Sequence, residues 1–145
     1  MLKSVLIGAV ALTLAGCATV DVTNYRSERP PLDLAQYFNG TVDGWGMFQD
    51  RSGKVVRRFT VRIDAKWDGN RGTLDEHFEF SDGEKQNRIW TLVKDGDRYT
   101  GTAGDVVGTG QGIQQGSAFN MRYVLRVPWA GRTIDVDMDD WMWRI

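Results

Sequence analysis

The sequence predicts an all-β fold: an eight-stranded antiparallel up-and-down barrel, preceded by a signal peptide, a short tether and a short N-terminal helix. Apolar and polar residues alternate along most of the chain after position 40, as in VVRRFTVRIDAKW at 55–67. A period of two is typical of a strand with one buried face. Short clusters rich in glycine and aspartate separate these runs, which favours hairpins between antiparallel neighbours. Closure would remove both sheet edges; an open half-barrel is the alternative.

The beginning of the chain has the composition of a bacterial export signal. Lys3 precedes an apolar stretch that is too short to span a bilayer. That stretch ends in Leu14-Ala15-Gly16-Cys17, which resembles the lipoprotein box, where signal peptidase cuts before a cysteine that carries a diacylglycerol. We therefore expect a signal peptide at 1–16 and lipidation at Cys17, and an ordinary secretory signal is the alternative. Because Cys17 is the only cysteine, no internal disulfide can form, which favours the lipid.

A lipid on Cys17 would attach the mature protein to the bacterial cell envelope. Ala18, and not aspartate, follows the cysteine. In the lipoprotein sorting rule this implies the outer membrane, with the protein facing the periplasm. Residues 17–31 are mostly polar and end in two prolines, so we expect a lipidated tether there. The remaining residues, 32–145, are long enough for one domain.

The domain begins with one short helix and continues as strands. Residues 32–39 read as a helix with Asp33 as N-cap, and Asn39-Gly40 ends it. The segment 104–117 holds five glycines, which indicates either two strands with a bend or a flexible lip over the barrel mouth. We expect strands near 41–49, 55–67, 73–80, 86–94, 98–107, 110–116, 118–127 and 132–144.

Four charged residues break the alternation, because they fall on the apolar faces of different strands: Arg57, Glu76, Arg88 and Asp140. An isolated buried ion is very unfavourable, so such residues must be paired, solvated at a barrel mouth, or matched by a ligand. One interpretation is an internal ion network that fixes the strand register. The other is a site whose arginines hold the carboxylate or phosphate head group of a ligand.

Six large residues share the inward faces with these charges and could line a cavity for the tail of such a ligand. An eight-stranded barrel is wide enough to hold one small ligand. The same side chains would fill the core if the barrel has no cavity. They are Phe59, Phe78, Trp90, Met121, Tyr123 and Met138.

Several motifs resemble a bacterial lipoprotein family, domain-of-unknown-function family 3833. They include the lipoprotein box, Tyr37-Phe38-Asn39-Gly40, Leu74-Asp75-Glu76-His77-Phe78 and Asp139-Asp140-Trp141-Met142. Members are often encoded near fatty-acid-modifying methyltransferases, which implies a connection to lipids. The chain also resembles lipocalins distantly, which implies a calyx-like barrel. It departs from the lipocalin Gly-x-Trp motif, because Gly40-Thr41-Val42 lacks the tryptophan.

These observations favour a binding protein over an enzyme. The leading hypothesis is a barrel that binds a fatty acid, a phospholipid or a similar amphiphile. The alternative is a ligand-free adaptor that binds another envelope protein through Trp129, Trp141 and Trp143. His77 is the only histidine and faces outward, so we expect no catalytic residue, no metal and no cofactor. Basic residues are scattered, so we expect no nucleic-acid partner.

Overall fold

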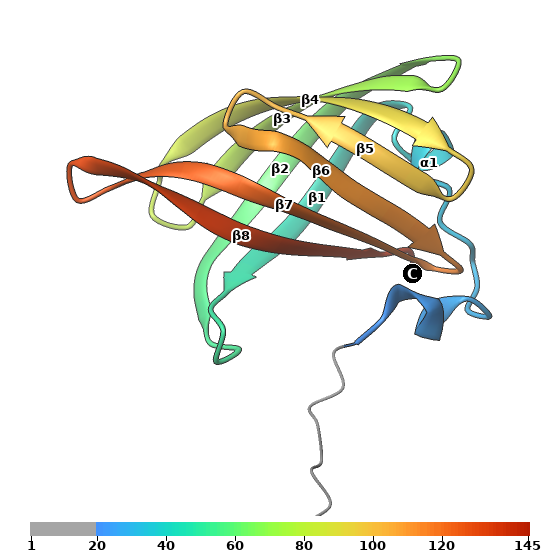
Figure 1. The fold of residues 1–145 in the computed structure, drawn as a ribbon, viewed down its shortest axis with the longest axis horizontal. Helices are drawn as coiled ribbons and strands as arrows, with labels where there is room; N and C mark the ends of the chain where they lie inside the picture. The colour runs from blue at the N-terminus through green and yellow to red at the C-terminus, as the bar shows by residue number, and fades with distance from the viewer. Residues whose placement is uncertain (1–19) are drawn as a thin grey trace, which may run out of the picture.

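The structure, a computed structural model, describes residues 20–145. They form one sheet of eight strands with two short helical segments before it (Figure 1). The predicted signal peptide and Cys17 lie outside the described residues. The elements are η1 (Val22–Tyr25), α1 (Leu34–Tyr37), β1 (Gly40–Gln49), β2 (Val55–Asp68), β3 (Arg71–Phe80), β4 (Lys85–Asp95), β5 (Arg98–Thr102), β6 (Val106–Gln115), β7 (Ala118–Trp129) and β8 (Arg132–Trp143).

The strands follow one another in up-and-down order, as the sequence predicted. Each pairs antiparallel with the next, and the order β1 to β8 has no pairing between its first and last members. The sheet is therefore a curled half-barrel with two free edges, β1 and β8 (Figure 1). This is the open form that the sequence left as an alternative to closure.

One predicted strand boundary is wrong. The strand expected over 98–107 ends at Thr102, and β6 begins at Val106 and not near 110. The bend lies within β6, where the pairing with β7 shifts between Val107 and Gln111. Gly108 has a φ of +68° there, a backbone conformation that a residue with a Cβ adopts only at a cost.

The predicted helix is present but short, and Asp33 is its N-cap, accepting hydrogen bonds from the amides of Ala35 (3.1 Å) and Gln36 (3.3 Å). Around it, Leu32, Leu34 and Phe38 are buried against the core. The Trp67 indole N–H donates to the Phe38 carbonyl at 2.8 Å. Residues 32–39 therefore cover one end of the half-barrel, which we call the closed end.

The hairpins that join β1 to β2, β3 to β4 and β7 to β8 lie at the opposite end of the half-barrel, the open end (Figure 1). The β6–β7 hairpin lies at the closed end, where the Leu32 amide donates to the Gly116 carbonyl at 2.7 Å.

Within the range predicted as a tether, 17–31, the described chain lies on the sheet from η1 onward. Val22 is buried. The Tyr25 ring makes edge contacts with the rings of Trp141 and Trp143, each at 5.9 Å between centroids. Periodicity in the sequence could not predict this contact with the sheet, because only two residues of one 3₁₀ turn, Val22 and Tyr25, make it.

Candidate functional site

The inner face of the half-barrel carries a buried ion pair between Arg88 on β4 and Asp105 in the β5–β6 connection. Arg88 Nε lies 3.0 Å from both carboxylate oxygens, and Nη2 lies 2.9 Å from Oδ2. The Arg88 side chain is only 7% exposed, and that of Asp105 is 26% exposed. Sequence analysis did not single out Asp105: it placed this residue within a strand over 98–107, whereas in the structure it lies in the turn between β5 and β6.

Two further inward carboxyl groups lie beside this pair. Glu76 on β3 is buried and is the direct cross-strand neighbour of Arg88. Burial raises the pKa of Glu76 to about 8; Arg88 opposes this shift and Asp140 adds to it. The Tyr123 hydroxyl donates to Asp140 Oδ2 at 2.7 Å. Burial raises the pKa of Asp140 as well, and the hydrogen bond from Tyr123 opposes that shift.

These groups form what we call the inner network: Glu76, Arg88, Asp105, Tyr123 and Asp140. It contains one arginine and three carboxyl groups, so the acids outnumber the base. Burial raises the pKa of both Glu76 and Asp140, which favours their neutral, protonated forms over a second unpaired negative charge. The structure thus brings together three of the four inward charges found in the sequence.

The fourth, Arg57, lies apart at the open end. Its Nε is 2.8 Å from Asp82 Oδ2 and its Nη2 is 2.6 Å from Glu84 Oε2. The guanidinium carbon is 3.6 Å from the centre of the Phe80 ring. Arg57 therefore breaks the alternation of β2 because it stacks on an inward aromatic ring and reaches the β3–β4 hairpin. It does not meet Glu76 or Asp140.

The predicted cavity lining divides into buried and partly exposed residues. Phe78, Trp90, Met121 and Tyr123 are each at most 8% exposed. The Trp90 and Tyr123 rings make an edge contact at 5.1 Å. These four side chains belong to the packed core, and they fill the middle of the inner face.

Phe59 and Met138 are only partly buried. With three other inward residues they pack against the core at or next to the free edges β1 and β8. The Phe59 ring reaches the edge by lying over Gly46, where an added Cβ would overlap it. We call this set the edge strip: Val42, Phe48, Phe59, Met138 and Met142.

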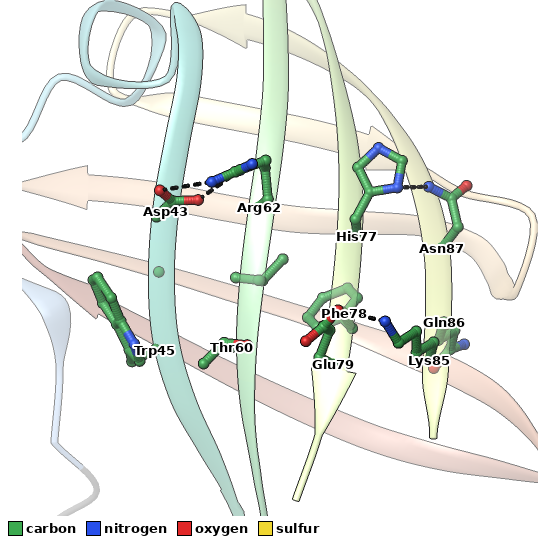
Figure 2. A pocket seen from close by; sticks show the side chains of 12 residues that line it. Asp43, Trp45, Thr60, Arg62, His77, Phe78, Glu79, Lys85, Gln86 and Asn87 are labelled. Atoms are coloured by element: carbon green, nitrogen blue, oxygen red, sulfur yellow. Dashed lines mark hydrogen bonds and ion pairs between the residues drawn. The ribbon is translucent and has the colours of Figure 1, made fainter. Parts of the chain in front are cut away.

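One depression among the described residues lies on the outer face of the sheet. It measures about 740 Å³ and spans β1 to β4 (Figure 2). Trp45, which is 79% exposed, borders it. Its charged groups are largely paired, with Arg62 on Asp43 at 2.9 Å and Lys85 on Glu79 at 2.6 Å. His77 faces outward, as predicted, and its Nδ1 lies 3.1 Å from the Asn87 side-chain nitrogen.

The three tryptophans expected to face outward differ in their contacts and in their exposure to solvent. Trp141 and Trp143 stack on each other at 5.5 Å and contact Tyr25. Trp129 remains 61% exposed at the β7–β8 hairpin. Trp129 and Trp45 are therefore more exposed than Trp143, which is 48% exposed although it is stacked, and Trp45 was not predicted.

Among residues 20–145, no helix is long and apolar enough to cross a membrane, and this same range holds no cluster of three or more metal-ligating side chains.

Comparison with known proteins gives a match to a protein family. No curated protein and no solved structure matches the chain. The family described as Protein of unknown function (DUF3833) matches residues 11–145. Nearly the whole chain is covered, and the protein belongs to the DUF3833 family.

Proposed function

We propose that this protein is an outer-membrane lipoprotein facing the periplasm, and that its half-barrel binds an amphiphile along the edge strip. The observation that carries the proposal is the edge strip itself. Its inward apolar side chains lie along both free edges and remain partly exposed, although burying them would be favourable by about 25 cal/mol per Å². An acyl chain laid against the strip would bury this surface.

The packed middle of the inner face limits how the amphiphile can lie. Because Trp90 and Tyr123 fill that region, a tail deep in a closed lumen is not what this geometry favours. A tail laid along the edges β1 and β8 would contact side chains that are still partly exposed. We therefore place the tail on the edge strip in this proposal, and its head group toward solvent.

The charges favour a particular head group. Both inward arginines already bind carboxylates, Arg88 on Asp105 and Arg57 on Asp82 and Glu84. A fatty-acid carboxylate would have to displace one of these partners, which is costly for a buried pair. A zwitterionic phospholipid whose head group stays in solvent requires neither arginine as a partner, so we favour it over a free fatty acid.

The envelope location rests on the lipoprotein box, Leu14-Ala15-Gly16-Cys17. A diacylglycerol on Cys17 and a third acyl chain would anchor the protein stably, since one chain alone binds a membrane only marginally. Mass spectrometry of protein from membranes tests this part directly: the N-terminal peptide should begin at Cys17 and carry lipid. An unmodified peptide that begins elsewhere would contradict it.

Photocrosslinking tests the binding site. The purified full-length protein is mixed with lysophosphatidylethanolamine or a C16 fatty acid, each with a diazirine on the acyl chain. We expect saturable crosslinks to β1, β2 and β8, stronger with the phospholipid. Crosslinks confined to the outer face, or that never saturate, would contradict the proposal.

Two neighbouring residues of β2 provide a matched control. Phe59→Gln places a polar group in the edge strip, whereas Thr60→Gln changes the adjacent, outward position. We expect the first substitution to reduce crosslinking several-fold and the second to leave it unchanged. Equal loss in both variants would indicate a general effect on folding, which circular dichroism would reveal.

A second candidate, an envelope adaptor, is favoured by one observation. Trp45 lies 79% exposed beside the outer depression, and exposed tryptophans often anchor protein interfaces. A photoreactive amino acid at position 45 in living cells should then give one discrete crosslinked protein. The same probe at the exposed position 56 serves as control, since Val56 lies on the same face of the sheet near its open end.

A further inference from the structure

We infer that the closed end of the half-barrel rests on the bilayer surface, with Val20, Tyr37, Trp143 and Arg144 in the head-group layer. We call these four residues the closed-end patch. The inference rests on the lipid anchor of the proposed function, and goes beyond it by fixing which surface touches the membrane.

The short distance to the anchor carries the first step. Val20 is the third residue after Cys17, and this stretch of chain spans at most about 11 Å when fully extended. The head-group layer is itself about 5–7 Å thick on each side of the bilayer. Since Val22 is already buried in the domain, little chain remains to hold the domain away from the lipid.

The docking of η1 decides which end faces the bilayer. Tyr25 packs on Trp141 and Trp143 at the end of β8, and the Arg26 Nε donates to the Gln115 side chain at 2.9 Å. Both contacts lie at the closed end, beside the β6–β7 hairpin (Figure 1). The described chain therefore joins the sheet at the closed end.

The exposed side chains at this end suit a membrane interface. Val20, Tyr37 and Trp143 are 53%, 46% and 48% exposed, although large apolar side chains gain by burial. Tryptophan and tyrosine are enriched at the head-group level of membranes. The Arg144 guanidinium lies 5.6 Å from the centre of the Tyr37 ring, where it can reach lipid phosphates.

Three acidic groups lie nearby: Asp33 is paired with a base, whereas Glu28 and Asp97 bond to neutral donors and keep their negative charge. Glu28 accepts a hydrogen bond from the Ser117 hydroxyl at 2.8 Å. Asp33 is bound by the Lys94 ammonium at 2.8 Å. The side-chain amide of Gln115 donates to Asp97 at 3.2 Å.

The opposite end would stand well clear of the bilayer. β1 has 10 residues and β7 has 12, and a strand rises about 3.3 Å per residue. The hairpin that contains Ser52 therefore lies on the order of 30 Å from the closed end. The two ends should report different surroundings in one experiment.

The chain is suited to site-specific labelling. Cys17 is its only cysteine, and its sulfur is blocked when it carries lipid, so an introduced cysteine is the one free thiol. The lipidated full-length protein would carry Tyr37→Cys at the closed end or Ser52→Cys at the open end, each labelled with an environment-sensitive nitrobenzoxadiazole dye. Gln36→Cys, at the exposed neighbouring position, replaces Tyr37→Cys if the latter fails to fold.

The labelled proteins are reconstituted into vesicles of phosphatidylethanolamine and phosphatidylglycerol with brominated acyl chains. We expect a blue-shifted, strongly quenched dye at position 37 or 36, and an unquenched dye at position 52. Protein that floats with vesicles but has an unquenched dye at the closed end would overturn this orientation and leave the anchor standing. Protein that does not float would overturn both. Quenching at position 52 alone would reverse the orientation.

Discussion

Arg88 and Asp105 make three hydrogen-bond contacts of 2.9 to 3.0 Å that join strand β4 to the connection between β5 and β6. The pair holds a turn against the inner face at the point where the predicted strand is interrupted. The Arg88 side chain is almost inaccessible to solvent, and the Asp105 side chain is only partly accessible. Removing either partner therefore leaves the other charge poorly hydrated.

We expect Arg88→Met to destabilise the protein by about 3 kcal/mol, the size typical of breaking a buried pair. Arg62→Met is the matched control, since Arg62 binds Asp43 with similar geometry on the exposed outer face. Exposed pairs contribute at most about 1 kcal/mol. Urea unfolding followed by tryptophan fluorescence measures both, and equal losses would refute the assignment of Arg88 to the core.

Glu76 should make stability depend on pH in an unusual direction. Burial raises its pKa to about 8 in the folded protein from an ordinary value of 4.5, so between these pH values the folded state holds a proton that the unfolded chain has released. The stabilisation is complete below pH 4.5 and is lost as pH rises toward 8, by at most about 1.4 kcal/mol per pH unit.

Glu76→Gln should abolish this dependence, because glutamine is neutral at every pH. The difference in unfolding free energy between wild type and variant should therefore move in favour of the variant between pH 5 and pH 8. Glu79→Gln provides the control, since Glu79 is exposed and its pKa is lowered by Lys85. Parallel pH profiles for wild type and Glu76→Gln would show that Glu76 titrates normally.

Gly116 couples the β6–β7 hairpin to the N-terminal segment. Its φ is +54°, and a Cβ built there would overlap the carbonyl oxygen of Tyr25. Gly69 has nearly the same φ, +57°, with nothing within 4 Å of its own Cβ position. Alanine substitutions at the two glycines therefore separate the cost of backbone strain from the cost of steric overlap with the Tyr25 carbonyl.

We expect Gly69→Ala to cost about 1–2 kcal/mol through strain alone. Gly116→Ala should cost more and should detach η1, which exposes the segment around Tyr25 to protease. Thermal unfolding and limited proteolysis with N-terminal peptide mapping measure the two effects. An intact N-terminal segment in Gly116→Ala would contradict the coupling.

The strand pattern could be predicted from the sequence because alternation and turn residues are local. The same local rule placed Glu76, Arg88 and Asp140 on inward faces, as their positions in the inner network bear out. It could not supply partners, because pairing depends on which turns the curl of the sheet brings together. Asp105 and the Asp82 and Glu84 hairpin were missed for that reason, and Arg57 was grouped with acids it does not meet.

The extent of closure was likewise beyond the sequence. Whether β1 and β8 pair depends on the summed twist of eight strands, and no single residue sets that twist. One inward glycine does reflect the curl of the sheet in the structure. At Gly101 an added Cβ would lie 2.7 Å from both Leu92 and Met121, so the absence of a side chain there lets the curled sheet pack on itself.

The closed end depends on one hydrogen bond that can be removed with little change in shape. The Trp67 indole N–H donates to the Phe38 carbonyl at 2.8 Å, next to the last turn of α1. Trp67→Phe keeps an aromatic ring but leaves this carbonyl without its donor, which we expect to cost about 1–2 kcal/mol. Trp45→Phe is the control, because Trp45 is 79% exposed and should be neutral.

Hydrogen exchange distinguishes a loosened closed end from general destabilisation. The amides of Tyr37 and Phe38 donate to the carbonyls of Asp33 and Leu34, each at 2.9 Å, and they report on α1 directly. In Trp67→Phe these two amides should exchange faster, while amides in the middle of β3 and β4 should change only as much as global stability does. If α1 exchanges as in the wild type, Trp67 packs in the core without holding the closed end, and the cover must depend on Leu32, Leu34 and Phe38 alone.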